Sequence, residues 1–109
     1  MSDAHESITV TTHVEGGSAT IELAGELDLH AAGQLSEAIA EVLEASPSTV
    51  GIDARGLTFA DSAGLRALLQ GRSDAESRGT TLRLTHLSEA LDRLLDMTGL
   101  RKILHDPVT

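Results

Sequence analysis

The apolar residues of this chain switch between two spacings, and this switch constrains the fold more than any other feature. Alternate positions from Ile8 to Val14 are β-branched, with polar neighbours between them, which is typical of a half-buried strand. Residues Ala19 to Leu23 alternate in the same way. Between the two runs, Glu15-Gly16-Gly17-Ser18 predicts a turn, because glycine accepts a positive φ. The two runs therefore predict a β-hairpin at the start of the domain.

The next segment, from about His30 to Glu44, has its apolar residues three and four positions apart. This spacing predicts a helix with one buried face, which Ser46-Pro47-Ser48 would end. The residues expected on that face are Ala31, Leu35, Ala38, Ile39, Val42 and Leu43.

In the second half of the chain, segments with the pattern of a short strand alternate with segments that have the pattern of a helix. We expect a short strand around residues 50–52, a loop from Arg55-Gly56 onward, and a helix from about Ala63 to Ser77. A strand around residues 82–84 and a helix between the caps Ser88 and Gly99 follow. Residues 100–104 predict a last short strand or a helical turn, and residues 106–109 a tail.

This order of elements predicts an α/β fold. Helices that connect successive strands imply parallel pairing, so we expect a mixed, mainly parallel β-sheet with an N-terminal antiparallel hairpin and helices packed against it. A length of 109 residues, without a repeat or a linker, predicts a single domain over residues 1–109 with a core of about 7–105.

The charge and composition exclude several classes of partner. The net charge of -9 would repel phosphates, so we expect no nucleic acid partner and no attraction to an anionic membrane surface. No apolar run approaches the ~20 residues that span a bilayer, and we expect no membrane insertion. The first seven residues do not have the pattern of a signal peptide. We therefore expect a cytoplasmic protein.

The sequence also lacks the patterns of a catalytic or metal centre. There is no cysteine, and no two of the five histidines lie three or four residues apart. No glycine-rich phosphate loop occurs, and Asp61-Ser62-Ala63-Gly64 does not have the glycine of a nucleophile elbow. We therefore expect no enzyme activity, no metal and no cofactor.

The stretch from Leu57 to Leu65 holds the only phenylalanine, Phe59, and predicts the loop between a buried strand and a helix. Asp61 and Ser62 stand where a helix N-cap belongs, and a cap is the interpretation that the local pattern favours. The alternative is that Ser62 accepts a phosphate, which a helix N-terminus tolerates through its free amides and its dipole.

A second acidic segment is Gly25-Glu26-Leu27-Asp28, in which Asp28 also stands where it would cap a helix. If the second and third strands are parallel, their ends lie on one rim of the sheet. Asp28 and Ser62 are then expected to lie near each other.

These segments resemble the STAS domain family, named for sulfate transporters and anti-sigma-factor antagonists. The likeness rests on Gly25–Asp28, on Asp53–Leu65 with its Asp-Ser-x-Gly-Leu motif, on Leu94–Leu100, and on the Ile8–Leu23 hairpin. Ala63 departs from the family, which often has Ser or Thr at this position. The departure leaves Ser62 as the only hydroxyl of the motif.

The resemblance is greatest to free-standing bacterial anti-sigma-factor antagonists, and it implies partner switching. In this mechanism the unphosphorylated protein binds an anti-sigma factor that is also a serine kinase, and a sigma factor is released. The kinase phosphorylates Ser62 with ATP, binding ends, and a serine phosphatase restores it. The implied partner-binding residues are Asp28, Asp61, Ser62, Ala63, Gly64 and Leu65.

Two other roles remain open at this point. Some small STAS proteins resemble subunits that brace an ATPase in a lipid-transport complex, where no phosphorylation is needed. Another role is a domain that senses a nucleotide or small ligand at the rim of the sheet. The Asp-Ser-x-Gly-Leu context of Ser62 favours the antagonist.

Overall fold

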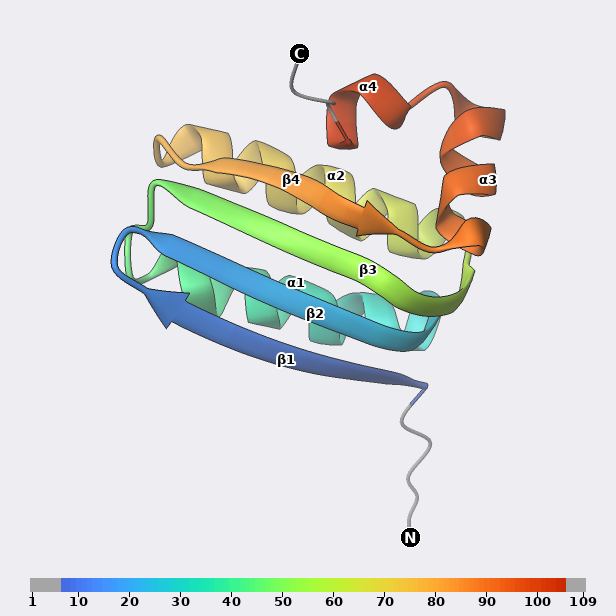
Figure 1. Ribbon diagram of the computed structural model, residues 1–109, viewed down its shortest axis with the longest axis horizontal. Helices are drawn as coiled ribbons and strands as arrows, with labels where there is room; N and C mark the ends of the chain where they lie inside the picture. Colours follow the sequence, from blue (N-terminus) through green and yellow to red (C-terminus); the bar gives the residue numbers. More distant parts are fainter. Residues whose placement is uncertain (1–6, 106–109) are drawn as a thin grey trace, which may run out of the picture.

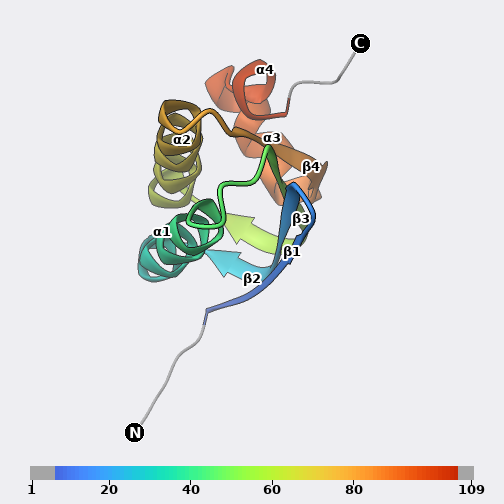
Figure 2. The ribbon, with the colours of Figure 1, turned by 90° about the vertical axis from the view of Figure 1, so that its left-hand side faces the viewer.

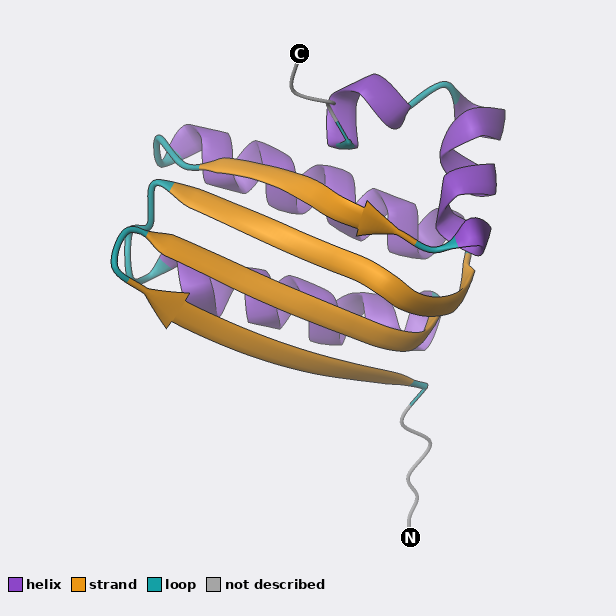
Figure 3. Cartoon of the chain, viewed as in Figure 1, coloured by secondary structure: helices purple, strands orange, loops and turns teal. Residues whose placement is uncertain are grey.

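The computed structural model describes residues 7–105 and has four strands and four helices in that range (Figure 1). Strands and helices alternate after an initial hairpin, and short loops connect them (Figure 3). The elements are β1 (Ile8–Glu15), β2 (Ser18–Leu27), α1 (Leu29–Leu43), β3 (Thr49–Ala60), α2 (Ser62–Ser77), β4 (Thr81–Leu87), α3 (Glu89–Thr98) and α4 (Arg101–Leu104).

The four strands form one sheet in the order β1-β2-β3-β4. β1 pairs antiparallel with β2, whereas β2–β3 and β3–β4 are parallel. The hairpin turn lies between Glu15 and Ser18, and Gly16 there has a φ of +64°. The predicted mixed, mainly parallel sheet with an N-terminal hairpin is therefore confirmed.

Helices α1 and α2 lie next to each other on one face of the sheet, and the turned view shows the opposite face without a helix (Figure 2). The buried residues of α1 are the six that the apolar spacing predicts. They pack against alternate residues of the strands, such as Ile21 and Ile52, which are fully buried. The core therefore lies between the sheet and this helical layer.

Strand β3 is longer than expected, and here the sequence-based prediction is wrong. Residues Leu57–Ala60, predicted as a loop, continue β3 and pair with β2 as far as Leu27 opposite Ala60. Gly56 is not a turn residue: a Cβ there would lie 2.9 Å from the Cβ of Ala24. Its lack of a side chain allows the two strands to approach each other.

The C-terminal elements show which of the two structures expected for residues 100–104, a short strand or a helical turn, is formed. Residues 101–104 form the helical turn α4, not a strand. Helix α3 packs against β3 and lies beyond the end of β4 in Figure 1, with Leu91 and Leu95 buried. The predicted tail at residues 106–109 lies outside the described residues.

Candidate functional site

The two acidic segments meet at one end of the sheet. Leu27 and Ala60 are paired as the last residues of β2 and β3, so Asp28 and Asp61 follow them side by side. The backbone N–H of Asp61 donates to the carbonyl of Leu27 at 3.2 Å, which fixes the two chain ends together. Ser62 follows Asp61 and therefore lies on the same rim as Asp28.

The structure decides which residue caps α2. Asp61 has extended backbone angles, and its Oδ1 accepts hydrogen bonds from the amides of Ala63 and Gly64 at 3.0 and 3.1 Å. Ser62 is the first residue of the helix and is exposed. Its hydroxyl makes no hydrogen bond with any other residue of the described range. The cap is thus provided by the carboxylate, and the hydroxyl is available to another molecule.

Asp28 holds the start of α1 in the same manner. Its Oδ1 accepts from the amide of Ala31 at 2.9 Å and from the hydroxyl of Ser7 at 3.1 Å. The hydrogen bond from the Ala31 amide is the main cause that lowers the pKa of Asp28, and the Ser7 hydroxyl and nearby His30 lower it further. The carboxylate is therefore charged and held in place at neutral pH.

The other three residues of the Asp-Ser-x-Gly-Leu motif differ in exposure. Ala63 is half-buried, whereas Gly64 and Leu65 are buried. A Cβ on Gly64 would lie 2.6 Å from the carbonyl oxygen of Leu27, so the glycine allows α2 to approach the end of β2. Gly64 and Leu65 are therefore covered by the fold, whereas Asp28, Asp61, Ser62 and Ala63 keep exposed surface at the rim.

Two exposed apolar side chains flank this rim, and sequence reasoning missed their position. Leu29, directly after Asp28, is 71% exposed, and Phe59, near the end of β3, is 47% exposed. The signal for Leu29 was present in the sequence, since it lies outside the apolar face that begins at Ala31. Both side chains add exposed apolar surface at the end of the sheet that carries Asp28 and Asp61.

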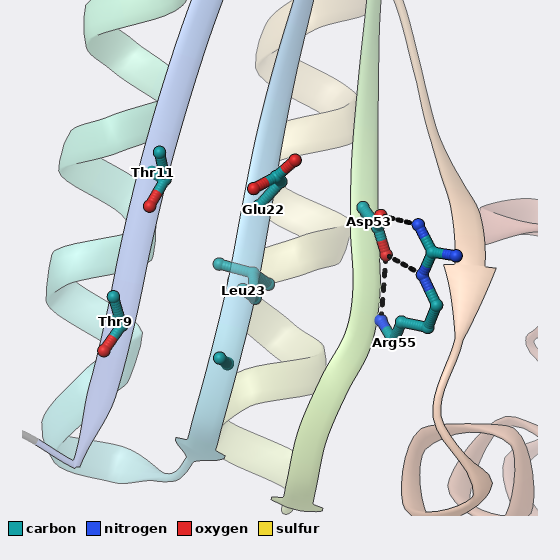
Figure 4. Close-up of a pocket in the computed structure, with 7 residues that line it drawn as sticks. Thr9, Thr11, Glu22, Leu23, Asp53 and Arg55 are labelled. Carbon is teal, nitrogen blue, oxygen red and sulfur yellow. Dashed lines mark hydrogen bonds and ion pairs between the residues drawn. The ribbon is translucent and has the colours of Figure 1, made fainter.

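A separate hollow of about 250 Å³ lies on the sheet face that carries no helix (Figure 4). Asp53 and Arg55 form an ion pair there at 2.7 Å, and Glu22 of β2 lies beside them. The guanidinium of Arg55 is the main cause that lowers the pKa of Asp53. Asp53 and Arg55 satisfy each other, and none of the predicted site residues lines this hollow.

The described residues provide neither a membrane-spanning helix nor a cluster of metal ligands. None of the helices in the described range has the length and apolar character needed to cross a membrane. Within residues 7–105, no three His, Cys, Asp or Glu side chains are grouped so as to hold a metal ion.

The fold and the Asp28–Ser62 rim define a STAS domain, and the chain belongs to that family. The family model described as "Mlab, STAS domain" matches residues 10–105. The chain is similar to the anti-sigma-F factor antagonist RsfB of Mycobacterium tuberculosis, with 32% identity over 97% of this chain and 91% of the relative. It is also 32% identical to the anti-sigma-B factor antagonist of Bacillus subtilis, over 77% of this chain and 76% of that protein.

Solved structures agree with this assignment. An anti-sigma factor antagonist from Mycobacterium paratuberculosis superposes with a TM-score of 0.80 and 28% identity, covering 94% of this chain and 86% of that one. The unphosphorylated form of the anti-sigma factor antagonist SpoIIAA has the same fold, with a TM-score of 0.76 at 22% identity, over 92% of this chain and 89% of that one.

Proposed function

We propose that this protein is an anti-sigma-factor antagonist that works by partner switching at Ser62. The unphosphorylated protein binds an anti-sigma factor that is a serine kinase, in the cytoplasm, and a sigma factor is released. The kinase transfers the γ-phosphoryl group of ATP to the hydroxyl of Ser62, whose proton is lost, and ADP leaves. A serine phosphatase removes the phosphate by hydrolysis. The protein itself is binder and substrate, not enzyme.

The observation that supports this proposal most is that Asp61, and not Ser62, caps α2. Asp61 caps α2 with its carboxylate, so the exposed hydroxyl of Ser62 has no part in holding the helix. A phosphate can therefore be added without removal of any hydrogen bond within the described structure. The dipole at the start of α2 also favours an anion, by about 0.3–1 kcal/mol at an exposed site.

The same phosphate is unfavourable in an interface. It adds nearly two negative charges beside Asp61, on a chain whose net charge is already -9. A partner surface that fits a neutral hydroxyl offers no cation to pair with it, and burial of an uncompensated charge costs several kcal/mol. Since 1.4 kcal/mol is tenfold in affinity, binding should fall by orders of magnitude.

The test combines mass spectrometry with calorimetry. Candidate anti-sigma-factor kinases of the source organism are incubated with the protein and ATP, and the intact mass is measured. We expect one added phosphate in the parent and none in Ser62→Ala. Ser62→Ala should still bind the kinase, and Ser62→Asp should bind at least tenfold more weakly. Equal affinities of Ser62→Asp and the parent would refute the switch.

The same experiment separates this function from the other STAS roles. A subunit that braces an ATPase would bind it with the same affinity whether residue 62 is Ser, Ala or Asp. A ligand-sensing domain would give a binding isotherm with a small molecule in the absence of any kinase. Neither role needs the exposed hydroxyl that Ser62 presents.

A further inference from the structure

One helical glycine has no explanation within the fold. Gly33 lies inside α1, its φ is not in the left-handed region, and a Cβ built on it meets nothing within 4 Å. Glycine inside a helix lowers the equilibrium constant for helix formation about fivefold relative to alanine. Gly71 of α2 differs, since its Cβ would lie 2.5 Å from Cδ1 of Ile39. The packing of the chain explains Gly71, but it does not explain Gly33.

Gly33 opens a groove between α1 and α2 on the helical side of the molecule. The groove has a volume of about 320 Å³ and is lined mainly by small side chains, together with the larger Leu29, Arg66 and Gln70. In the turned view α1 and α2 run side by side at this surface (Figure 2). The lining includes Leu29, Ala32 and Gly33 from α1 and Ala63, Arg66 and Ala67 from α2.

The groove is continuous with the proposed phosphorylation site. Ala63 follows Ser62 in α2, and Leu29 follows Asp28 at the start of α1. The side chain of Leu29 is 71% exposed at the rim. A protein that covers Ser62 and Asp28 therefore reaches the groove without leaving the surface between the two helix N-termini.

The positive charge of Arg66 indicates which kind of partner segment the groove can bind. Arg66 is the one charged residue in the described lining, and it forms no ion pair with another residue of the described range. The other lining residues are uncharged, so Arg66 is a single positive charge beside this groove on a chain whose net charge is -9. An apolar side chain fits the hollow above Gly33, and a carboxylate fits the rim at Arg66.

We propose that this groove receives an apolar side chain of the anti-sigma factor, from a segment that also places a carboxylate against Arg66. The proposal rests on the proposed function and names a second contact of the same partner. Ser62 reports the phosphorylation state, and the groove between Leu29 and Arg66 contributes affinity and selects the partner. Gly33 leaves open the space that the partner needs, which a side chain at this position would occupy.

The test fills the groove without disturbing the fold. The probe is the kinase that phosphorylates Ser62 in the assay above, with a non-hydrolysable ATP analogue, and affinity is measured by calorimetry. Gly33→Leu should weaken binding at least tenfold, because the leucine occupies the hollow. The matched control is Gln34→Leu, which adds an apolar side chain at the adjacent exposed position outside the lining. It should leave the affinity within twofold.

Gly33→Ala, Leu29→Gln and Arg66→Glu complete the series. Gly33→Ala should raise the melting temperature by about 4 °C and weaken binding, a combination that a purely structural role would not produce. Leu29→Gln keeps the size of an exposed side chain and should weaken binding about tenfold. Arg66→Glu should weaken binding and reduce its dependence on salt. These exposed substitutions keep the proposal testable even if Gly33→Leu does not fold.

The outcomes separate this proposal from the switch itself. Parent-like affinity of Gly33→Ala, Leu29→Gln and Arg66→Glu, with loss of binding in Ser62→Asp, would overturn the groove and leave the switch intact. Equal weakening by Gly33→Leu and Gln34→Leu would also overturn it. A parent dimer that becomes monomeric in Gly33→Leu would assign the groove to a second copy of this chain and contradict the proposal.

Discussion

Replacement of Asp61 tests the structural basis of the proposed switch, because it asks which side chain holds the start of α2. Asp61→Ala removes an acceptor that serves two amides, at 3.0 and 3.1 Å. Loss of an N-cap carboxylate costs about 1 kcal/mol, within a range of roughly 0.5–2 kcal/mol. For 109 residues the entropy of unfolding is about 0.23 kcal/mol/K, so the melting temperature should fall by ~4 °C.

Asp61→Asn separates the hydrogen bonds from the charge. Asparagine caps a helix about as well as aspartate, so the two amides keep an acceptor. The lost charge at the helix N-terminus is worth about 0.3–1 kcal/mol, or ~1–4 °C. We therefore expect the parent to be most stable, Asp61→Asn to be intermediate and Asp61→Ala to be least stable, as measured by differential scanning calorimetry.

Ser62→Ala is the decisive comparison in this series. The Ser62 hydroxyl makes no hydrogen bond within the described range and its side chain is exposed, so the change should stay within ~0.5 kcal/mol. A loss in Ser62→Ala as large as that in Asp61→Ala would mean that the hydroxyl holds the helix. That result would refute the reasoning that a phosphate on Ser62 leaves the fold intact.

Three further changes test the packing and the charge near the site. Gly64→Ala should lower the melting temperature by several degrees, since its methyl would meet a backbone oxygen at 2.6 Å; unchanged stability would contradict the tight approach. Gly71→Ala should stabilise the Ile39→Val variant by ~1 kcal/mol in urea unfolding, because valine lacks the Cδ1 that lies 2.5 Å away. The pKa of Asp28 is depressed below 3.8, so its contribution to stability is complete above that pH and is lost as pH falls through the folded-state value. Ser7→Ala should raise this pKa in a carbon-13 NMR titration; no change would exclude the hydroxyl as a cause.

The helices and their buried faces were predictable because the signal is local. The spacing of apolar residues in α1 identified all six of its buried residues, since a helix repeats its face every three or four positions. Ser88 and Gly99 were recognised as the caps of α3 for the same reason. In each case the residues that carry the signal are close in sequence to the structure they determine.

The length of β3 was not predictable from local signals. Arg55-Gly56 has the composition of a loop, yet both residues lie in a strand that is paired with β2. Gly56 is required by the approach of Ala24, which is more than thirty residues earlier in the chain. A glycine that serves a distant contact has the same local appearance as a glycine that serves a turn.

The choice between Asp61 and Ser62 as the cap also depends on distant residues. Both are good N-cap residues, and the local pattern does not distinguish them. The pairing of Ala60 with Leu27 ends β3 one residue before Asp61, and Asp61 then keeps extended angles while Ser62 enters the helix. The availability of the Ser62 hydroxyl is therefore a consequence of sheet register.

Effects on stability and effects on partner binding have to be measured separately at the rim, because the same carboxylates contribute to both. Asp28 and Asp61 each hold a helix N-terminus, and they are also the charges that a phosphate on Ser62 would meet. An alanine at either position removes a cap and a charge together, so a loss of binding would not identify its cause. An asparagine at either position keeps the cap and removes only the charge. Replacement of Ser62 by aspartate adds a charge and leaves both caps in place. Reduced affinity in Asp28→Asn with a small change in melting temperature would therefore be a property of the partner interface.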